Sequence, residues 1–224
     1  MLKIIIGNKA YSSWSLRGWL AVRQSGLPYE ELVLPIYDEA WPQRRMQPDL
    51  AVSSGKVPTL WDGDVPIWDS LAIVETLNDM TGDTRFWPQD KAARALARSM
   101  AAEMHGGYVP LRKACPMNVR KVFPTGDPSE AVLENLSRIA ALWTQARTRF
   151  GAGGPYLFGA FGAADIMFAP VVFRIQGYGL PIQGDIARDY REAMLAHPWM
   201  MEWVESAQAE SWVLDQYEHA PDYS

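Results

Sequence analysis

Apolar runs of strand length recur in the first 70 residues. The run "LKIIIG" (2–7) predicts a buried strand, and "YEELVLP" (29–35) predicts a second strand closed by its proline. The stretch "VPTLWDGDVPIWDS" (57–70) places an Asp-Gly pair between two further short runs, which predicts a hairpin. A segment of irregular pattern with two prolines separates the second strand from this hairpin.

Two segments of the same region have the period of an amphipathic helix. In "SWSLRGWLAVRQSG" (13–26), apolar residues recur at three- and four-residue spacing, and Gly26 can cap the end. The segment "DSLAIVETLNDMTG" predicts a helix that Asp69 or Ser70 caps and that Gly82 ends. The order strand, helix, strand, irregular segment, strand, strand, helix predicts an α/β first part.

From Pro88 onward the strand pattern nearly disappears. The helical period continues through "DKAARALARSMAAEMHGGYVPLRKACP" (90–116), "SEAVLENLSRIAALWTQARTRFG" (129–151), "GAADIMFAPVVFRIQGYG" (162–179) and "IARDYREAMLAHPWMMEWVESAQ" (186–208). We therefore predict an all-helical second part, joined to the first by "GDTRFWPQD" (82–90).

Composition narrows the classes of partner. With a net charge of -5, the chain of 224 residues has no general attraction for nucleic acid or an anionic membrane. It has no apolar run long enough to span a bilayer, and its first apolar run is too short for a signal-peptide core. The single cysteine, Cys115, excludes an intrachain disulfide and favours a reducing, cytoplasmic setting. The three histidines lie far apart, so we expect no metal site.

Serines gather where the first strand gives way to the first helix. In "YSSWS", Ser12 and Ser13 stand at the expected helix N-terminus, where a serine is a good N-cap. A hydroxyl at the same place is also suited to chemistry on a bound anion, because a helix N-terminus attracts negative charge. The stretch alone does not separate the two roles.

Four stretches together resemble the soluble glutathione transferases, over essentially the whole chain. They are "SSGKVPTLWDGDVPIWDS" (53–70), the most specific, "YSSWSLRGWLA" (11–21), "GPYLFGAFGAADIMFAP" (154–170) and "EMHGGYVPLRKACPMN" (103–118). The second is similar to the "S-S-C-S-x-R" stretch of serine-type classes, above all zeta. The resemblance implies a thioredoxin-like domain with a mixed four-stranded sheet (1–82), an all-helical domain (88–224) and a homodimer.

The resemblance implies that glutathione is the co-substrate and that the first domain binds it. Ser12 is the primary candidate, and Ser13 the second, for a hydroxyl that stabilises the glutathione thiolate, since only the thiolate is a good nucleophile. The implied contacts to the rest of glutathione are the backbone of Val57 before a cis Pro58, Asp69 and Ser70 for the γ-glutamyl end, and Lys56, Arg44 or Arg45 for the glycyl carboxylate.

The helical domain is expected to supply the pocket for a small electrophile, with Tyr11, Trp14, Tyr108 and Arg112 as candidates. Trp14 departs from the zeta pattern, which has a cysteine there, so it either walls this pocket or packs between the domains. Met104, Tyr108, Arg112 and Cys115 recur at helical spacing, either as one stripe facing the cleft or as core residues. Facing the cleft, Arg112 would suit an acidic co-substrate. Arg17 is either a ligand or a helix charge that is solvated or lies at the domain interface.

In the third stretch the family has a Ser or Thr as N-cap and an aspartate three residues later. Here the N-cap position holds Gly162, so half of this capping box is missing. We expect the helix to form nevertheless, with Asp165 accepting hydrogen bonds from backbone N–H groups.

Two classes of function remain open on the sequence. The first is a transferase that activates glutathione for conjugation to, or isomerisation of, a small electrophile. The second is a glutathione-binding protein with low turnover, used for ligand carriage or regulation. The serines favour the enzyme, because a pure binder needs no thiolate. Disulfide reduction is disfavoured, since the opening stretch has no cysteine.

Overall fold

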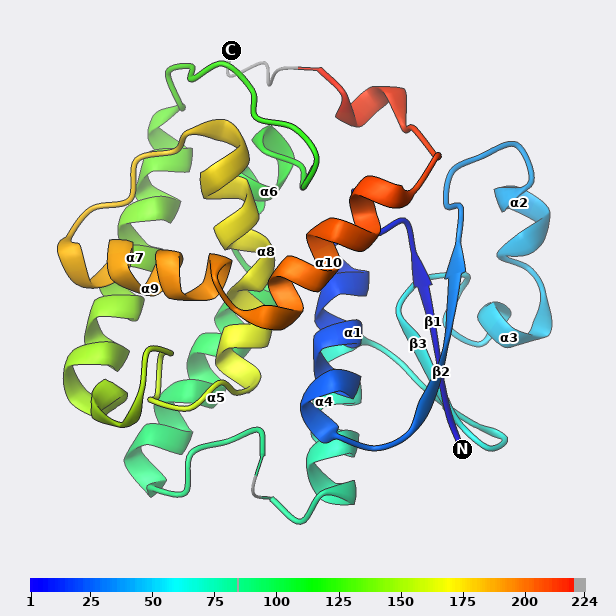
Figure 1. Ribbon diagram of the computed structural model, residues 1–224, viewed down its shortest axis with the longest axis horizontal. Helices are drawn as coiled ribbons and strands as arrows, with labels where there is room; N and C mark the ends of the chain where they lie inside the picture. Colours follow the sequence, from blue (N-terminus) through cyan, green and yellow to red (C-terminus); the bar gives the residue numbers. More distant parts are fainter. Residues whose placement is uncertain (84, 220–224) are drawn as a thin grey trace.

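The computed structural model describes residues 1–83 and 85–219. A small sheet flanked by helices forms one side of the molecule, and a helical bundle forms the other (Figure 1). This arrangement confirms the predicted fold of a mixed four-stranded sheet with helices followed by an all-helical part. Thr84 of the predicted linker, and the last five residues of the predicted helical domain, lie outside the described residues.

The sheet is built around a first strand that is buried on both faces. Strands β1 (Leu2–Gly7), β2 (Tyr29–Leu34), β3 (Thr59–Asp62) and β4 (Val65–Ile67) are ordered β2-β1-β3-β4. β1 pairs in parallel with β2 and antiparallel with β3, and β3 forms the predicted hairpin with β4. The consecutive isoleucines of β1 are fully buried, as expected for a strand covered on both faces.

Helices cover the two faces of this sheet. α1 (Ser13–Ser25) and α4 (Ser70–Met80) lie side by side between the sheet and the bundle, whereas α2 (Trp41–Arg44) and α3 (Pro48–Ala51) lie on the opposite side (Figure 1). α1 ends at Gly26 in the left-handed conformation, as its C-cap role requires. α4 ends two residues before the predicted Gly82.

The second part packs around one buried helix. Its helices are α5 (Lys91–Gly106), α6 (Val109–Ala114), α7 (Glu130–Phe150), α8 (Ala163–Tyr178), α9 (Asp185–Leu195) and α10 (Pro198–Ala209), with short 3₁₀ turns at Gly151–Gly153 and Asp215–Tyr217. α8 is buried along almost its whole length and packs against α1, α5 and α9. It therefore joins the bundle to the sheet part.

The helical pattern predicted over residues 90–116 is broken in its middle. α5 ends at Gly106, Tyr108 adopts a φ of 58°, and α6 begins at Val109. Pro110 explains the break, because its ring would clash with the Gly106 carbonyl in a continuous helix and it lacks the N–H to bond it. The idea of one stripe facing the cleft is therefore wrong: Met104 and Cys115 are fully buried in the core.

Asp165 caps α8 as expected. Its two carboxylate oxygens accept hydrogen bonds from the N–H of Gly162, at 2.9 Å, and from the N–H of Leu157, at 3.0 Å. The second bond ties the preceding loop to the helix N-terminus. A single buried side chain thus satisfies two backbone donors, which compensates for the hydroxyl missing at Gly162.

Replacing Asp165 with Asn should lower the free energy of unfolding by about 1–3 kcal/mol, because an amide has one acceptor oxygen for two buried donors. Urea denaturation measures the change. Asp185→Asn, an exposed first-turn residue of α9, is the matched control and should change stability by less than about 0.5 kcal/mol. Equal effects of the two substitutions would contradict the capping role of Asp165.

α1 approaches the loop before β3 so closely that only glycine fits at the contact. A Cβ added at Gly18 would lie 2.6 Å from Cβ of Pro58 and 2.7 Å from its Cγ. The contact fixes the distance between the start of α1 and the start of β3, where the predicted glutathione contacts lie.

Gly18→Ala should destabilise the protein by about 1–3 kcal/mol through overpacking, since Pro58 has no flexible side chain that could move away. Gly106→Ala, at the end of α5 with nothing within 4 Å of the added carbon, should leave stability unchanged or slightly raised. Thermal unfolding of both variants measures the difference. A Gly18 variant as stable as the wild type would show that this contact constrains nothing.

Candidate functional site at the junction of the two parts

Two cavities meet where α1 begins. The first, of about 580 Å³, lies between the start of α1, the loop before β3 and the start of α4; we call it the sheet-side lobe. The second, of about 870 Å³, lies toward α5, α6 and α8; we call it the helix-side lobe. Ser12, Trp14, Ile36, Tyr37 and His105 line both, so the two lobes form one continuous cleft.

Ser12 stands at the point shared by the two lobes. It is the N-cap of α1, it is buried, and its Oγ accepts the N–H of Ser15 at 3.2 Å. The hydroxyls of Ser12 and Ser15 are 2.7 Å apart, with Ser12 donating. Ser15 Oγ also accepts the N–H of Gly7, at the end of β1, at 2.8 Å. Ser13 is half-buried and lines only the helix-side lobe.

The loop that leads into β3 forms one wall of the sheet-side lobe. Its Val57–Pro58 bond is cis, as the resemblance implied, and both residues line the lobe. The hydroxyls of Ser53 and Thr59 donate to the carbonyl of Lys56 at 2.7 and 3.0 Å and hold the loop in place. Sheet pairing begins at Thr59, so the backbone of Val57 lies beyond the ladder.

The start of α4 forms the facing wall. Asp69 caps the helix by accepting the Leu71 N–H at 3.1 Å, and its other oxygen lies 2.9 Å from Nε2 of His105. The next residue, Ser70, lines the lobe with a fully buried hydroxyl that has no hydrogen-bond partner among the described residues. A buried hydroxyl without a partner is costly, which points to a ligand atom as its partner.

The predicted cations separate into two groups. Lys56 and Arg45 line the sheet-side lobe, and Arg45 also donates to the Ser54 carbonyl at 3.0 Å. Arg44 does not line it; both its terminal nitrogens bind Asp49, at 2.8 and 2.7 Å. This hydrogen-bonded pair lowers the pKa of Asp49. The alternative that assigned Arg44 to a ligand is therefore not supported by its position.

Trp14, which lines both lobes, lies close to two arginines. The guanidinium of Arg17 is 4.5 Å from the centre of the Trp14 ring, and that of Arg112 is 4.6 Å from it. Arg17 is fully buried, with its Nε donating to the Met167 carbonyl at 3.0 Å, so it is not a surface charge. Arg112 is half-buried and lines the helix-side lobe.

The two tyrosines predicted for this pocket have other partners. Tyr11 lines the helix-side lobe, but its hydroxyl donates to Glu218 at 2.6 Å and accepts from Arg120. Tyr108 lines neither lobe; its hydroxyl instead donates to Glu103 at 2.6 Å. The prediction that Tyr108 faces the electrophile pocket is wrong for this reason.

Three residues that line or support the cleft were not singled out from the sequence: His105 and Arg174 line it, and Ser15 supports Ser12. Ser15 follows the two candidate serines in the first turn of the expected helix, and His105 stands far along the chain from the other two histidines. Arg174 carried a usable signal, because it is the one charge in the long apolar run that follows Asp165, and a buried charge requires a partner. The sequence around Ser15 and His105 carries no comparable signal. The role of Ser15 depends on its contact with β1, and that of His105 on its contact with Asp69 at the start of α4.

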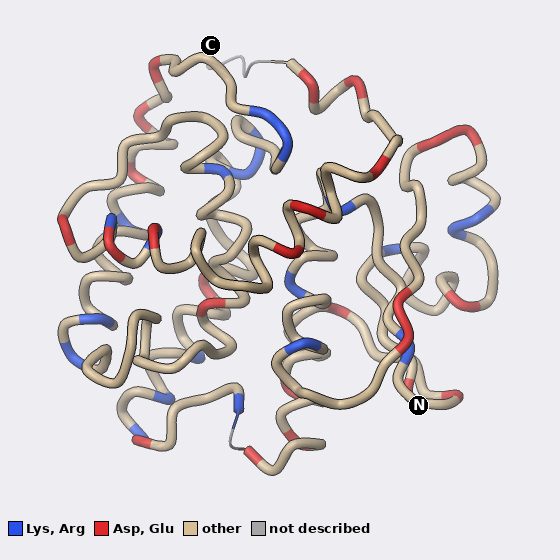
Figure 2. Tube along the Cα trace, in the orientation of Figure 1, with Lys and Arg blue, Asp and Glu red and all other residues tan. Residues whose placement is uncertain are grey.

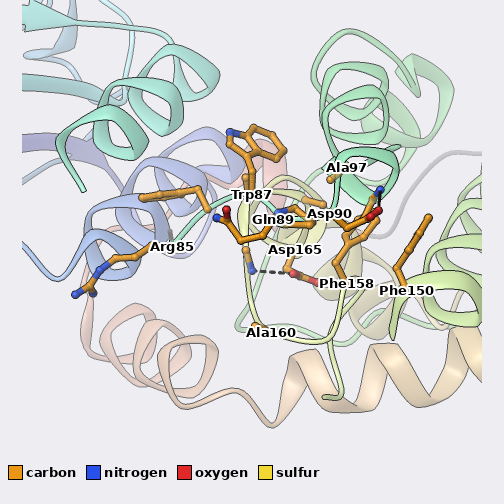
Figure 3. A pocket seen from close by; sticks show the side chains of 15 residues that line it. Arg85, Trp87, Gln89, Asp90, Ala97, Phe150, Phe158, Ala160 and Asp165 are labelled. Carbon is orange, nitrogen blue, oxygen red and sulfur yellow. Dashed lines mark hydrogen bonds between the residues drawn. The ribbon is translucent and has the colours of Figure 1, made fainter. Parts of the chain in front are cut away.

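A separate cavity of about 380 Å³ lies where the linker meets α5 and α8 (Figure 3). Asp165 is the acidic group at its α8 side, and burial raises the pKa of this carboxyl to about 6. Both oxygens of Asp165 already accept backbone hydrogen bonds, so its carboxylate is a structural group and not a free nucleophile. In residues 1–83 and 85–219, no group of His, Cys, Asp and Glu side chains is arranged to hold a metal ion, and no helix has the length and apolarity needed to cross a bilayer.

Comparison with known families gives matches in both parts. The model of the glutathione S-transferase N-terminal domain matches residues 11–80, and that of the C-terminal domain matches residues 129–206. Together they cover about two thirds of the chain. A comparison with curated proteins finds no match.

Solved structures with the same fold cover nearly the whole chain at low identity. A glutathione transferase homologue from Burkholderia, with bound glutathione, is 21% identical with a TM-score of 0.67, and covers 93% of this chain and 99% of its own. The Tau class enzyme from mango is 18% identical with a TM-score of 0.68, covering 92% and 96%. The theta class enzyme from Xanthomonas axonopodis pv. citri, with glutathione bound, is 19% identical with a TM-score of 0.63, covering 91% and 96%.

Ser15→Ala should lower the free energy of unfolding by about 1–3 kcal/mol, because the buried Gly7 N–H would lose its acceptor. Ser99→Ala removes an exposed serine hydroxyl of α5 and should change stability by less than about 0.5 kcal/mol. Chemical denaturation of the two variants tests the comparison. If Ser15→Ala is no more destabilising than Ser99→Ala, Ser15 does not anchor α1 to β1.

Proposed function

Because the chain belongs to the glutathione S-transferase family, we propose that it is an enzyme that binds glutathione in the sheet-side lobe and activates its thiol at Ser12. The observation that carries the proposal is the position of Ser12. Its hydroxyl caps the N-terminus of α1 and faces both lobes of the cleft. A thiolate placed there would meet a hydroxyl and the positive end of a helix at once.

Each end of glutathione has suitable partners in the sheet-side lobe. The Val57 backbone, beyond the end of the β3 ladder, is available to pair with the cysteinyl part as an added strand would. The unpartnered Ser70 hydroxyl, at the start of α4, suits the γ-glutamyl carboxylate, and Asp69 suits the γ-glutamyl ammonium. Lys56 and Arg45 suit the glycyl carboxylate.

Ser15 makes the Ser12 proton available. Ser12 Oγ already accepts the Ser15 N–H, and without a ligand its hydroxyl donates to Ser15. When a sulfur atom is bound, the Ser12 hydroxyl rotates toward it, and the Ser15 hydroxyl donates to Ser12 in its place. Ser15 can donate its hydroxyl proton to Ser12 because Ser15 Oγ still accepts a hydrogen bond from the Gly7 N–H. The hydrogen bond to sulfur favours the thiolate and lowers the thiol pKa.

The thiolate then attacks a small electrophile in the helix-side lobe, which opens on the other side of Ser12. The product is a conjugate, or an isomer where the adduct breaks down again. By family likeness we also propose a homodimer that works in the reducing cytoplasm, where the one cysteine, buried, would stay a thiol.

The alternative is a glutathione-binding protein with little turnover. It would use the same Val57, Ser70 and Lys56 contacts but would need no lowered thiol pKa. A panel of aryl halides, organic peroxides and unsaturated acids separates the two, because a transferase turns over at least one class faster than the spontaneous reaction. Binding of glutathione with no acceleration for any class would favour the alternative.

The thiol pKa of bound glutathione should lie at least about one unit below that of a free thiol, about 8.5. The ultraviolet absorbance of the thiolate across pH measures it. In Ser12→Ala the shift should disappear, because both the hydroxyl and the cap are lost, and kcat/KM should fall by about tenfold or more at neutral pH.

Ser13→Ala is the matched control, since it removes an identical hydroxyl one residue along the same helix. We expect it to keep the shift. If Ser13→Ala abolishes the shift and Ser12→Ala does not, the two serines exchange roles; if neither does, activation by a serine is wrong.

A further inference from the structure

We infer that the helix-side lobe is an anion site, and that the second substrate is a small electrophile carrying a carboxylate that Arg112 and Arg174 bind. The inference rests on the proposed function, because it assigns the other half of the same cleft. The observation behind the inference is that the positive charges in the walls of the helix-side lobe have no negative partner among the described residues.

The charged side chains of the helix-side lobe have one sign. Arg112, Lys113 and Arg174 line it together with His105, and no Asp or Glu is among the described residues of its walls. The Lys and Arg positions of α6 lie in a basic region that extends into the following loop (Figure 2). The sheet-side lobe differs, because Asp69 lies in its wall beside Lys56 and Arg45.

Arg174 is the most buried of these cations, with 4% of its surface exposed. It comes from the middle of α8, and its Nε donates to the Cys115 carbonyl at 2.8 Å. Its Nη1 is buried and has no hydrogen-bond partner among the described residues. Burial and then the charge of Arg112 lower the pKa of Arg174 to about 10, which leaves it protonated at neutral pH.

Arg112 also has no acidic partner among residues 1–83 and 85–219. Its Nη1 donates to the carbonyls of His105 and Gly107 at 3.2 and 3.3 Å, and its guanidinium lies over the Trp14 ring. The two carbonyl dipoles and the Trp14 ring offset part of the free-energy cost of burying the Arg112 guanidinium, but they supply no negative charge. Arg17, under the same ring, adds a further buried cation with an unpartnered Nη1.

Two described acidic groups beside wall residues of this lobe are already engaged. Asp69 pairs with His105 at 2.9 Å, and Glu218 accepts hydrogen bonds from Tyr11 and Asn118 and pairs with Lys121 at 2.6 Å. An incoming anion would therefore bring Arg112 and Arg174 a full negative charge that the described walls of this lobe do not supply. Two guanidinium groups suit a planar carboxylate, which accepts two N–H bonds from such a fork.

The remaining walls suit an apolar body attached to that carboxylate. They comprise the aromatic rings of Tyr11, Trp14, Tyr37 and Tyr217 and the apolar side chains of Ile36, Val109, Pro116 and Met117. An unsaturated acid fits this description. In an unsaturated acid that also carries a neutral carbonyl group, the thiolate pair forms the S–C bond at the carbon β to that carbonyl. The C=C π pair moves toward the carbonyl to give an enolate, whose α-carbon takes a proton from water, equal to the one the thiol released. Arg112 and Arg174 hold the carboxylate and so orient the double bond toward the sulfur.

Binding of an unreactive pair of probes tests the site without any turnover. 4-Oxo-4-phenylbutanoic acid and its methyl ester differ only in the charge of one end. Isothermal titration with S-methylglutathione at saturation, which fills the sheet-side lobe, should give at least about tenfold tighter binding for the acid. Equal affinities, or binding of neither probe, overturn the inference. Displacement of the acid by S-methylglutathione also overturns it, because the arginines would then serve the carboxylates of glutathione.

Arg112→Met should abolish the preference for the acid while leaving the weak binding of the ester unchanged. Arg112→Lys should restore part of it, since a point charge replaces a two-pronged donor. Arg188→Met removes one positive charge from the exposed face of α9 and is the matched control, which should bind both probes as the wild type does. A loss of acid binding in the control equal to that in Arg112→Met would mean that net charge, not a site, selects the acid.

Kinetics separate this inference from the proposed function. The unsaturated analogues, 4-oxo-4-phenylbut-2-enoic acid and its methyl ester, are compared as kcat/KM divided by each spontaneous rate with glutathione. We expect the acid to be favoured by at least about tenfold, and the preference to vanish in Arg112→Met. Enhancement of both without preference overturns the carboxylate site alone, whereas acid binding without enhancement of either overturns the transferase and keeps the site.

Discussion

The hydrogen bond from the Gly7 N–H to Ser15 Oγ, at 2.8 Å, ties the end of β1 to the first turn of α1. Everything proposed for the cleft depends on where that helix begins. The bond holds Ser15 in position. Ser15 donates its N–H to Ser12 Oγ and accepts the Ser12 hydroxyl, and Ser12 caps the N-terminus of α1. On the next turn, Gly18 admits Pro58 against the helix, so the loop before β3 is held at a fixed distance from Ser12. The hydroxyl proposed to be catalytic and the wall of the proposed glutathione site thus share one support.

The cleft joins two halves of different electrostatic character at that helix end. The sheet-side lobe mixes charges, as suits glutathione, which carries both an ammonium and carboxylates. The helix-side lobe is walled by cations from α6 and α8, arranged around Trp14. A zeta-like enzyme has a cysteine at the position of Trp14, so the tryptophan makes this pocket distinct. Its ring faces two guanidinium groups that would otherwise lie in apolar surroundings.

The fold was predictable from the sequence because its determinants are local. The isoleucine run of β1, the Asp-Gly turn of the hairpin and the cap at Gly26 each specify their element through nearby residues, and all three occur in the structure. The errors arose where a distant or competing constraint decides. Pro110 interrupts a period that continues through Tyr108, and Arg44 is engaged by Asp49. The domain limits at 82 and 88, and the roles of the site residues, stay predictions. Arg174 could have been found from its charge alone, whereas Ser15 and His105 could not, because β1 and α4 supply their partners.

The central claim is that Ser12, at the end of a helix anchored by Ser15, meets the sulfur of glutathione. A crystal structure of the complex with glutathione tests it most directly. We expect the sulfur atom to lie within about 3.5 Å of Ser12 Oγ, and Ser15 Oγ still to accept the hydrogen bond from the Gly7 N–H. A sulfur atom beyond hydrogen-bond reach of Ser12, placed against Ser13 or against neither serine, would contradict it.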